Sequence, residues 1–192
     1  MTEQRTLFVG IGSRHGDDQI GWRVADSLRS RVSSGVEVRE ASTPSHLLDW
    51  LDGADRLIVC DACQARRRAD SGEQSILHRW RWPTLQVSML RSAGSHSFGL
   101  PQVLQLAERL GTLPKDVIVF GVEGTRFDAF SEMSPSVGGA LETIVETILE
   151  ESGVVPVPTG RDDDDRRHDG RWEPVEHGDT INDVRCEDAS HA

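Results

Sequence analysis

The glycine-rich stretch at residues 7–21 constrains the fold of this chain more than any other part of its sequence. It opens with the apolar run 7–9, which has no polar alternation, as is typical of a strand that is covered on both faces. Three glycines follow and allow backbone conformations that a side chain would forbid. Apolar residues then recur at helical spacing over 20–28. The stretch therefore predicts a buried strand, a tight turn and a helix, an arrangement that usually carries a site at the carboxyl end of the strand.

Strands and helices are predicted to alternate over the rest of the first 152 residues. Thr43 is a candidate N-cap, with Pro44 at the first helical position. The predicted elements are strands at 36–40, 57–60, 74–82 (at the edge of the sheet) and 117–122, and helices at 19–31, 44–51, 100–110 and 137–149. This order predicts an α/β fold, a three-layer sandwich in which a mostly parallel central sheet carries helices on both faces.

The chain is predicted to divide into an α/β domain at residues 1–152 and an acidic tail at residues 153–192. The hydrophobic periodicity ends near residue 152, and the run 162–165 consists of four aspartates. Low hydrophobicity with high charge is typical of segments that bury too little apolar surface to fold. We therefore expect the tail to be disordered.

Composition excludes several classes of protein. The formal net charge of −11 argues against nucleic acid as a partner, because the neutralisation of phosphates needs a basic face. No apolar run reaches the roughly 18 residues that a transmembrane helix needs, and no signal peptide precedes the first strand, so we expect a cytoplasmic protein without a membrane partner. Three cysteines, an odd number, do not form a disulfide framework.

Two adjacent carboxylates, Asp17 and Asp18, stand where the first helix begins. The glycine spacing before them is loosely like a dinucleotide-binding fingerprint, but a phosphate at that helix end would meet two like charges. A pair of carboxylates suits a cation better. We assign Asp17 to capping of the helix and Asp18 to function, and the reverse assignment remains open.

Asp61 and His96 are the other candidate site residues. Asp61 follows an apolar strand, where an unpaired carboxylate is costly to bury, although it also suits an Asx turn. His96 lies in a loop of small residues, where a histidine is also commonly exposed to solvent. A parallel sheet would bring Asp18, Asp61 and His96 to one edge. Two oxygen ligands and one nitrogen ligand suit zinc, nickel or iron rather than calcium or magnesium.

Cys60 and Cys63 form a CxxC motif, so a thiol oxidoreductase is an alternative. Redox CxxC motifs place the nucleophilic cysteine at a helix N-terminus, which lowers its pKa. Cys60 instead ends a predicted strand. We therefore interpret both residues as buried packing cysteines.

With these residues and their spacing, residues 6–150 resemble the hydrogenase maturation proteases, endopeptidases that trim the large subunit of nickel–iron hydrogenases. The resemblance rests on four stretches: Gly-Ile-Gly-Ser with Gly-Asp-Asp-Gln-Ile-Gly at 10–13 and 16–21, Leu-Ile-Val-Cys-Asp-Ala at 57–62, Ser-His-Ser-Phe-Gly-Leu at 95–100, and Gly-Val-Glu at 121–123. Their order and spacing are specific in combination.

The resemblance implies a function and a site. The metal-binding and catalytic residues of the family correspond to Asp18, Asp61 and His96, and Glu40 stands where the family often has an acid. The implied supporting residues are Asp17, Glu40, Gly12 and Gly16. The implied reaction is removal of the C-terminal extension of a hydrogenase large-subunit precursor after nickel insertion. Nickel would then come with the substrate, and a divalent transition metal such as zinc could substitute.

The turn at residues 12–16 is about one residue shorter than is usual in the family. This difference leaves open a second function: a non-catalytic protein or chaperone that binds a metal-loaded precursor without cutting it.

Deletion of residues 153–192 should leave the free energy of unfolding unchanged, because a disordered tail contributes no packing. Urea denaturation of the full chain and of the shortened chain checks this expectation. A loss of more than about 1 kcal/mol on deletion would show instead that the tail packs on the domain.

Overall fold

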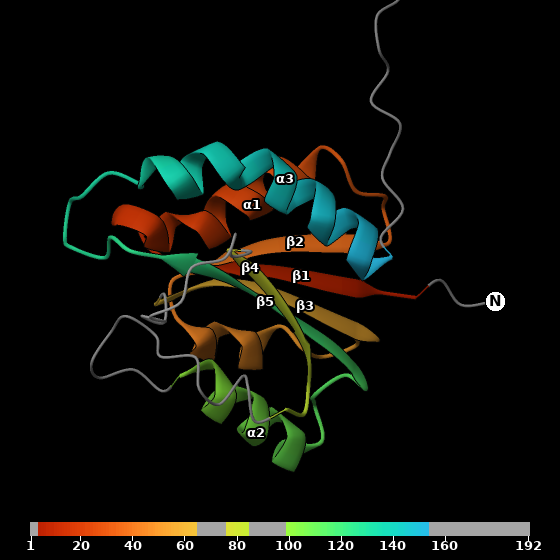
Figure 1. The fold of residues 1–192 in the computed structure, drawn as a ribbon. Helices are drawn as coiled ribbons and strands as arrows, with labels where there is room; N and C mark the ends of the chain where they lie inside the picture. The colour runs from red at the N-terminus through yellow and green to blue at the C-terminus, as the bar shows by residue number, and fades with distance from the viewer. Residues whose placement is uncertain (1–3, 65–75, 85–98, 154–192) are drawn as a thin grey trace, which may run out of the picture. The chain divides into compact units, whose positions relative to one another are not determined.

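The computed structural model describes residues 4–64, 76–84 and 99–153, and these residues contain one five-stranded sheet (Figure 1). The strand order is β2-β1-β3-β5-β4. The first four strands of that order run parallel, and β4 pairs antiparallel with β5 at the edge, as predicted. The strands are β1 (Thr6–Ile11), β2 (Val36–Ala41), β3 (Arg56–Gln64), β4 (Leu77–Arg81) and β5 (Asp116–Gly124).

Helices cover both faces of the sheet and confirm the predicted three-layer sandwich. The helical elements are the 3-10 helices η1 (Gly16–Gln19) and η2 (Pro44–Asp49) and the α-helices α1 (Ile20–Arg29), α2 (Leu100–Leu110) and α3 (Pro135–Ser152). Helices α1 and α3 pack on one face, whereas η2 and α2 pack on the other (Figure 1). None of the helices in the described ranges is long and apolar enough to cross a bilayer.

The apolar side chains of the strands pack in two separate hydrophobic cores, one on each face of the sheet. In β1, Phe8 packs in the core under α1 and α3, while Leu7 and Val9 pack in the core under η2 and α2. Successive side chains of a strand point to opposite faces, so a strand covered on both sides needs apolar residues at every position. This requirement explains why the run 7–9 shows no polar alternation.

Two predicted elements differ from those observed. The segment after Thr43 is the 3-10 helix η2, not an α-helix, and the Thr43 side chain makes no capping hydrogen bond. Strand β3 does not end at Cys60 but continues to Gln64, so Asp61 lies within it. The reason is that β5 runs alongside β3 to Gln64, whereas the pairing of β1 with β3 ends at Cys60. Asp61 is thus the first residue of β3 beyond its pairing with β1.

The neighbouring strands β1 and β3 lie at a topological switch point. After β1 the chain forms α1 on one face and adds β2 on one side, and after β2 it forms η2 on the other face and adds β3 on the opposite side of β1. Open α/β sheets commonly bind their ligands outside the carboxyl ends of the strands at such a switch point.

Close backbone packing fixes α1 against these strands. A Cβ atom on Gly10 of β1 would lie 1.9 Å from the carbonyl oxygen of Gly21 in α1. A Cβ atom on Gly21 would lie 2.0 Å from the carbonyl oxygen of Ile11 and 2.8 Å from that of Cys60. Only glycine permits this approach, so the start of α1 lies directly over β1 and β3.

The variant Gly10→Ala should lose at least about 2 kcal/mol of unfolding free energy, because its new methyl group would press on backbone that cannot rotate away. The matched control is Gly139→Ala in α3, where an added Cβ atom meets nothing within 4 Å. That control should gain about 0.5–1 kcal/mol from helix propensity. Chemical denaturation measures both, and equal stability of the Gly10→Ala variant and the parent protein would contradict this account.

Candidate active site

The 3-10 helix η1 brings Asp18 to Asp61. Asp18 lies in η1, directly after the glycine turn, and η1 packs against β3. The packing of η1 against β3 places Asp18 near Asp61, and the negative charge of Asp18 raises the pKa of Asp61. The structure therefore brings together two of the three residues that the sequence predicted for the site.

Asp61 is a buried acid with few partners. Only 9% of the surface of Asp61 is exposed to solvent. Burial raises its pKa to about 8, the charge of Asp18 adds to this effect, and the backbone N–H of Ala62 opposes it in part. Within the described residues no ion pair compensates the Asp61 carboxylate. Burial of Asp61 thus favours its protonated form.

Asp17 has a different environment from Asp18, although the two are adjacent. It is fully buried, and its carboxylate accepts hydrogen bonds from the backbone N–H groups of Thr125 (2.7 Å), Arg126 (2.9 Å) and Ser134 (2.6 Å). Burial raises the pKa of Asp17, but these hydrogen bonds outweigh burial and hold that pKa below its ordinary value. The prediction that Asp17 caps the first helix is wrong, because its carboxylate binds the β5–α3 loop and not the helix that follows Asp17.

The glycines of the turn have structural roles that the geometry makes explicit. A Cβ atom on Gly12 would lie 2.1 Å from the carbonyl oxygen of Asp18. Gly16 has a φ of +50°, and a Cβ atom there would lie 2.2 Å from the carbonyl oxygen of Arg126. Gly12 thus lets the turn close on Asp18, and Gly16 lets the β5–α3 loop approach the turn. Their predicted contribution to substrate binding stays a prediction.

Glu40 of β2 lies in a different environment from Asp61. Its carboxylate pairs with the guanidinium of Arg29 in α1 at 2.6 Å. Asp18, not Glu40, is the acid that raises the pKa of Asp61. The supporting role predicted for Glu40 stays a prediction.

The third candidate, His96, lies outside the described residues, as do residues 65–75, the rest of residues 85–98 and residues 154–192 of the predicted tail. Within residues 4–64, 76–84 and 99–153, no three histidine, cysteine or acidic side chains come close enough to hold a metal ion. The described part of the site therefore supplies two carboxylates, those of Asp18 and Asp61.

The positions of the cysteines oppose the redox alternative. Cys60 packs in the core under α1 and α3, whereas the Cys63 sulfur lies beside Gly121, on the other face of the sheet. Burial raises the pKa of the Cys60 thiol far above its ordinary value, and the nearby Asp61 and Cys63 add to the shift. A thiol in this state supplies no nucleophilic thiolate.

The β5–α3 loop, residues 125–134, is the part of the site region that sequence reasoning missed. Besides the bonds to Asp17, the loop accepts a hydrogen bond from Gly16 N–H at Ser131 O (2.8 Å) and one from Asp17 N–H at Arg126 O (2.7 Å). These partners are more than 100 residues apart in sequence, and no local pattern signals such a contact.

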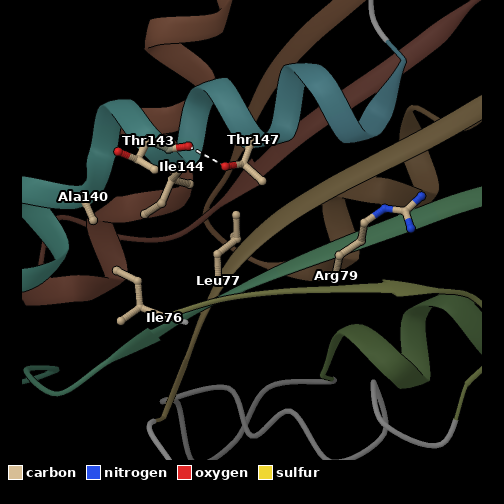
Figure 2. A pocket seen from close by; sticks show the side chains of 7 residues that line it. All are labelled: Ile76, Leu77, Arg79, Ala140, Thr143, Ile144 and Thr147. Atoms are coloured by element: carbon tan, nitrogen blue, oxygen red, sulfur yellow. Dashed lines mark hydrogen bonds between the residues drawn. The ribbon is translucent and has the colours of Figure 1, made fainter. Parts of the chain in front are cut away.

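A cavity of about 340 Å³ lies elsewhere, between β4 and α3 (Figure 2). Its lining includes Leu77 and Arg79 from the strand and Thr143 and Thr147 from the helix. The Thr147 hydroxyl donates a hydrogen bond to the Thr143 carbonyl at 2.7 Å. None of the candidate acids lines this cavity, so its position does not mark the site.

The family model for hydrogenase maturation proteases matches residues 23–151. The hydrogenase expression/formation protein HupD of Thiocapsa roseopersicina is 25% identical over 160 residues, which cover 78% of this chain and 68% of that protein. The corresponding protein HoxM of Azotobacter vinelandii is 29% identical over 175 residues, 87% of this chain and 82% of its own. The structure of the hydrogenase maturating endopeptidase HybD from E. coli superimposes with a TM-score of 0.65 at 26% identity and covers 81% of this chain and 98% of its own.

The chain belongs to the hydrogenase maturation protease family. The family match confirms the resemblance found in the sequence, and with it the class of enzyme, a hydrolase that acts on protein. The similarity to HybD confirms the α/β fold.

In metal-free protein, the buried acid Asp61 should make stability fall as pH rises. Below its ordinary pKa of 3.8 it is protonated in both the folded and the unfolded state, but between 3.8 and about 8 only the folded state keeps the proton. The contribution of Asp61 is therefore complete below pH 3.8 and is lost as the pH approaches 8, by at most about 1.4 kcal/mol per pH unit.

Urea denaturation of the parent protein and of Asp61→Asn, in chelator and across this pH range, checks the expectation. The difference between the two stabilities should change with pH in favour of the variant as pH rises. A difference that is the same at every pH would contradict the raised pKa of Asp61.

Proposed function

We propose that this protein removes the C-terminal extension of a nickel–iron hydrogenase large-subunit precursor after nickel insertion, and that Asp18, Asp61 and His96 form the site that engages the metal. The observation that carries this proposal is the approach of Asp18 to the buried Asp61 at the switch point of the sheet. The family membership supports the reaction class. The cytoplasmic location predicted from the sequence is part of the same proposal.

The charges of Asp18 and Asp61 support the metal-binding part of the proposal. The negative charge of the half-buried Asp18 opposes ionisation of the buried Asp61, and a cation bound between them would stabilise both charges and replace the proton on Asp61. Oxygen ligands from both acids, with imidazole from His96, suit nickel or zinc. Such an ion leaves coordination positions for groups of the precursor or for water, and in this proposal nickel arrives as part of the substrate.

The two acids of the turn have separate roles in this proposal. Asp18 faces the site, whereas Asp17 is used entirely in holding the β5–α3 loop to the turn. Asp17 thus fixes the position of the turn that carries Asp18. Asp61 is held by a strand that pairs with β5 on one side, so its backbone does not depend on the turn.

Substitutions of the site residues should abolish processing of a nickel-loaded large-subunit precursor. The variants Asp18→Asn, Asp61→Asn and His96→Ala should each cleave at least about 100-fold more slowly than the parent protein, because each removes one group that contacts the metal. Mass spectrometry of the precursor's C-terminus measures the rate. The matched control is Asp26→Asn, an exposed acid on α1, which should cleave at the parent rate.

Cleavage at the parent rate by Asp61→Asn or His96→Ala would contradict the assigned site. A parent protein that forms a complex with the precursor but leaves its C-terminus intact would show the non-catalytic binding protein instead.

A further inference from the structure

Phe130, in the β5–α3 loop, projects its ring into solvent. Phe130 is 91% exposed to solvent. Leu110, which is 62% exposed, is the other large exposed hydrophobic residue in the described part of the chain. Single exposed apolar residues are common on protein surfaces. The exposure of Phe130 becomes informative only together with its backbone and its contacts.

The backbone of Phe130 is strained. Its φ is +63°, and no other non-glycine residue within the described ranges has a positive φ. A bulky residue in the left-handed region costs about 1–3 kcal/mol and persists only where the surroundings enforce it. Folding alone therefore favours glycine at this position and gains nothing from an exposed ring.

His15 enforces this conformation. The backbone N–H of Phe130 donates a hydrogen bond to His15 Nδ1 at 3.0 Å. The two rings also meet edge to face, with centroids 5.3 Å apart and planes at 77°. The ring of Phe130 is thus held in a defined orientation although solvent surrounds most of it.

The same loop is tied to the turn that carries Asp18. The carboxylate of Asp17 binds the loop through three backbone N–H groups, and the N–H of Gly16 binds Ser131 O. Figure 1 shows this loop, between β5 and α3, at the carboxyl ends of the parallel strands, where α1 also starts. Phe130 therefore lies in a loop that is bound directly to the turn carrying Asp18.

We infer that Phe130, positioned by His15, is a docking residue for the protein substrate, and that its ring inserts into an apolar recess on the precursor beside the scissile segment. The inference rests on the proposed function. A pre-oriented aromatic ring gains its full burial on binding while losing little freedom, which is the property of residues that dominate the energy of protein interfaces.

The test compares the steady-state cleavage of a nickel-loaded hydrogenase large-subunit precursor by four variants. Phe130→Ala and Phe130→Gly should raise KM about tenfold with kcat unchanged, because they remove docking but leave the site intact. Phe130→Tyr keeps a ring and should stay within about threefold of the parent KM. The matched control is Leu110→Ala, the other exposed large hydrophobic residue, which should leave KM unchanged.

A binding measurement provides a second readout. Phe130→Ala in an Asp61→Asn background should bind the same precursor about tenfold more weakly than Asp61→Asn alone. Thermal denaturation should show that Phe130→Gly is at least as stable as the parent, since glycine relieves the positive φ.

The outcomes separate this inference from the proposed function. A parent protein that cleaves, with KM and affinity unchanged in Phe130→Ala, overturns the docking role alone. A parent protein that neither binds nor cleaves the precursor overturns the proposed function and this inference with it. A Phe130→Ala variant that only dissociates a dimer of this chain, seen by sedimentation, overturns the inference in favour of self-association.

Discussion

The contact between Gly10 and Gly21 determines where the candidate site lies. Because neither residue has a side chain, α1 packs with its backbone directly on β1, and its first turn reaches the carbonyl group of Cys60 in β3. The 3-10 helix η1 precedes α1 and is carried against β3 by the same contact. Asp61 stands at the point where β1 stops pairing with β3, so the approach of α1 also brings Asp18 to Asp61. A larger residue at 10 or 21 would move the turn and separate the two acids.

Asp17 makes a second, electrostatic link from the turn. A fully buried carboxylate is tolerated only where donors surround it, and here all three hydrogen bonds come from the backbone of one loop. The negative charge of Asp17 therefore joins the start of the first helix to the segment between β5 and α3. The two adjacent acids of the turn therefore have different roles. Asp17 binds the loop between β5 and α3, and the negative charge of Asp18 acts on Asp61 and raises its pKa. The exposed ring of Phe130 belongs to the part of the chain that Asp17 holds.

Local sequence patterns predicted most of this fold and part of the site. The runs at 57–60 and 117–122 predicted buried central strands because two-sided burial leaves an unbroken apolar pattern. Asp18 and Asp61 could be predicted as neighbours because parallel strands align their carboxyl ends. The length of β3 could not be predicted, since residues 61–64 pair only with β5 and no local sequence pattern indicates that pairing. The contacts of Asp17 with Thr125 and Ser134 join residues more than 100 positions apart, beyond the reach of any periodicity.

Calorimetric titration with Ni²⁺ is the decisive measurement of whether Asp18 and Asp61 form one cation site, as we propose. We expect one site per chain in the parent protein, loss of that site in Asp61→Asn and in Asp18→Asn, and unchanged binding in the surface control Asp26→Asn. Binding of Ni²⁺ that survives both site substitutions would contradict the assignment of Asp18 and Asp61 to one cation site.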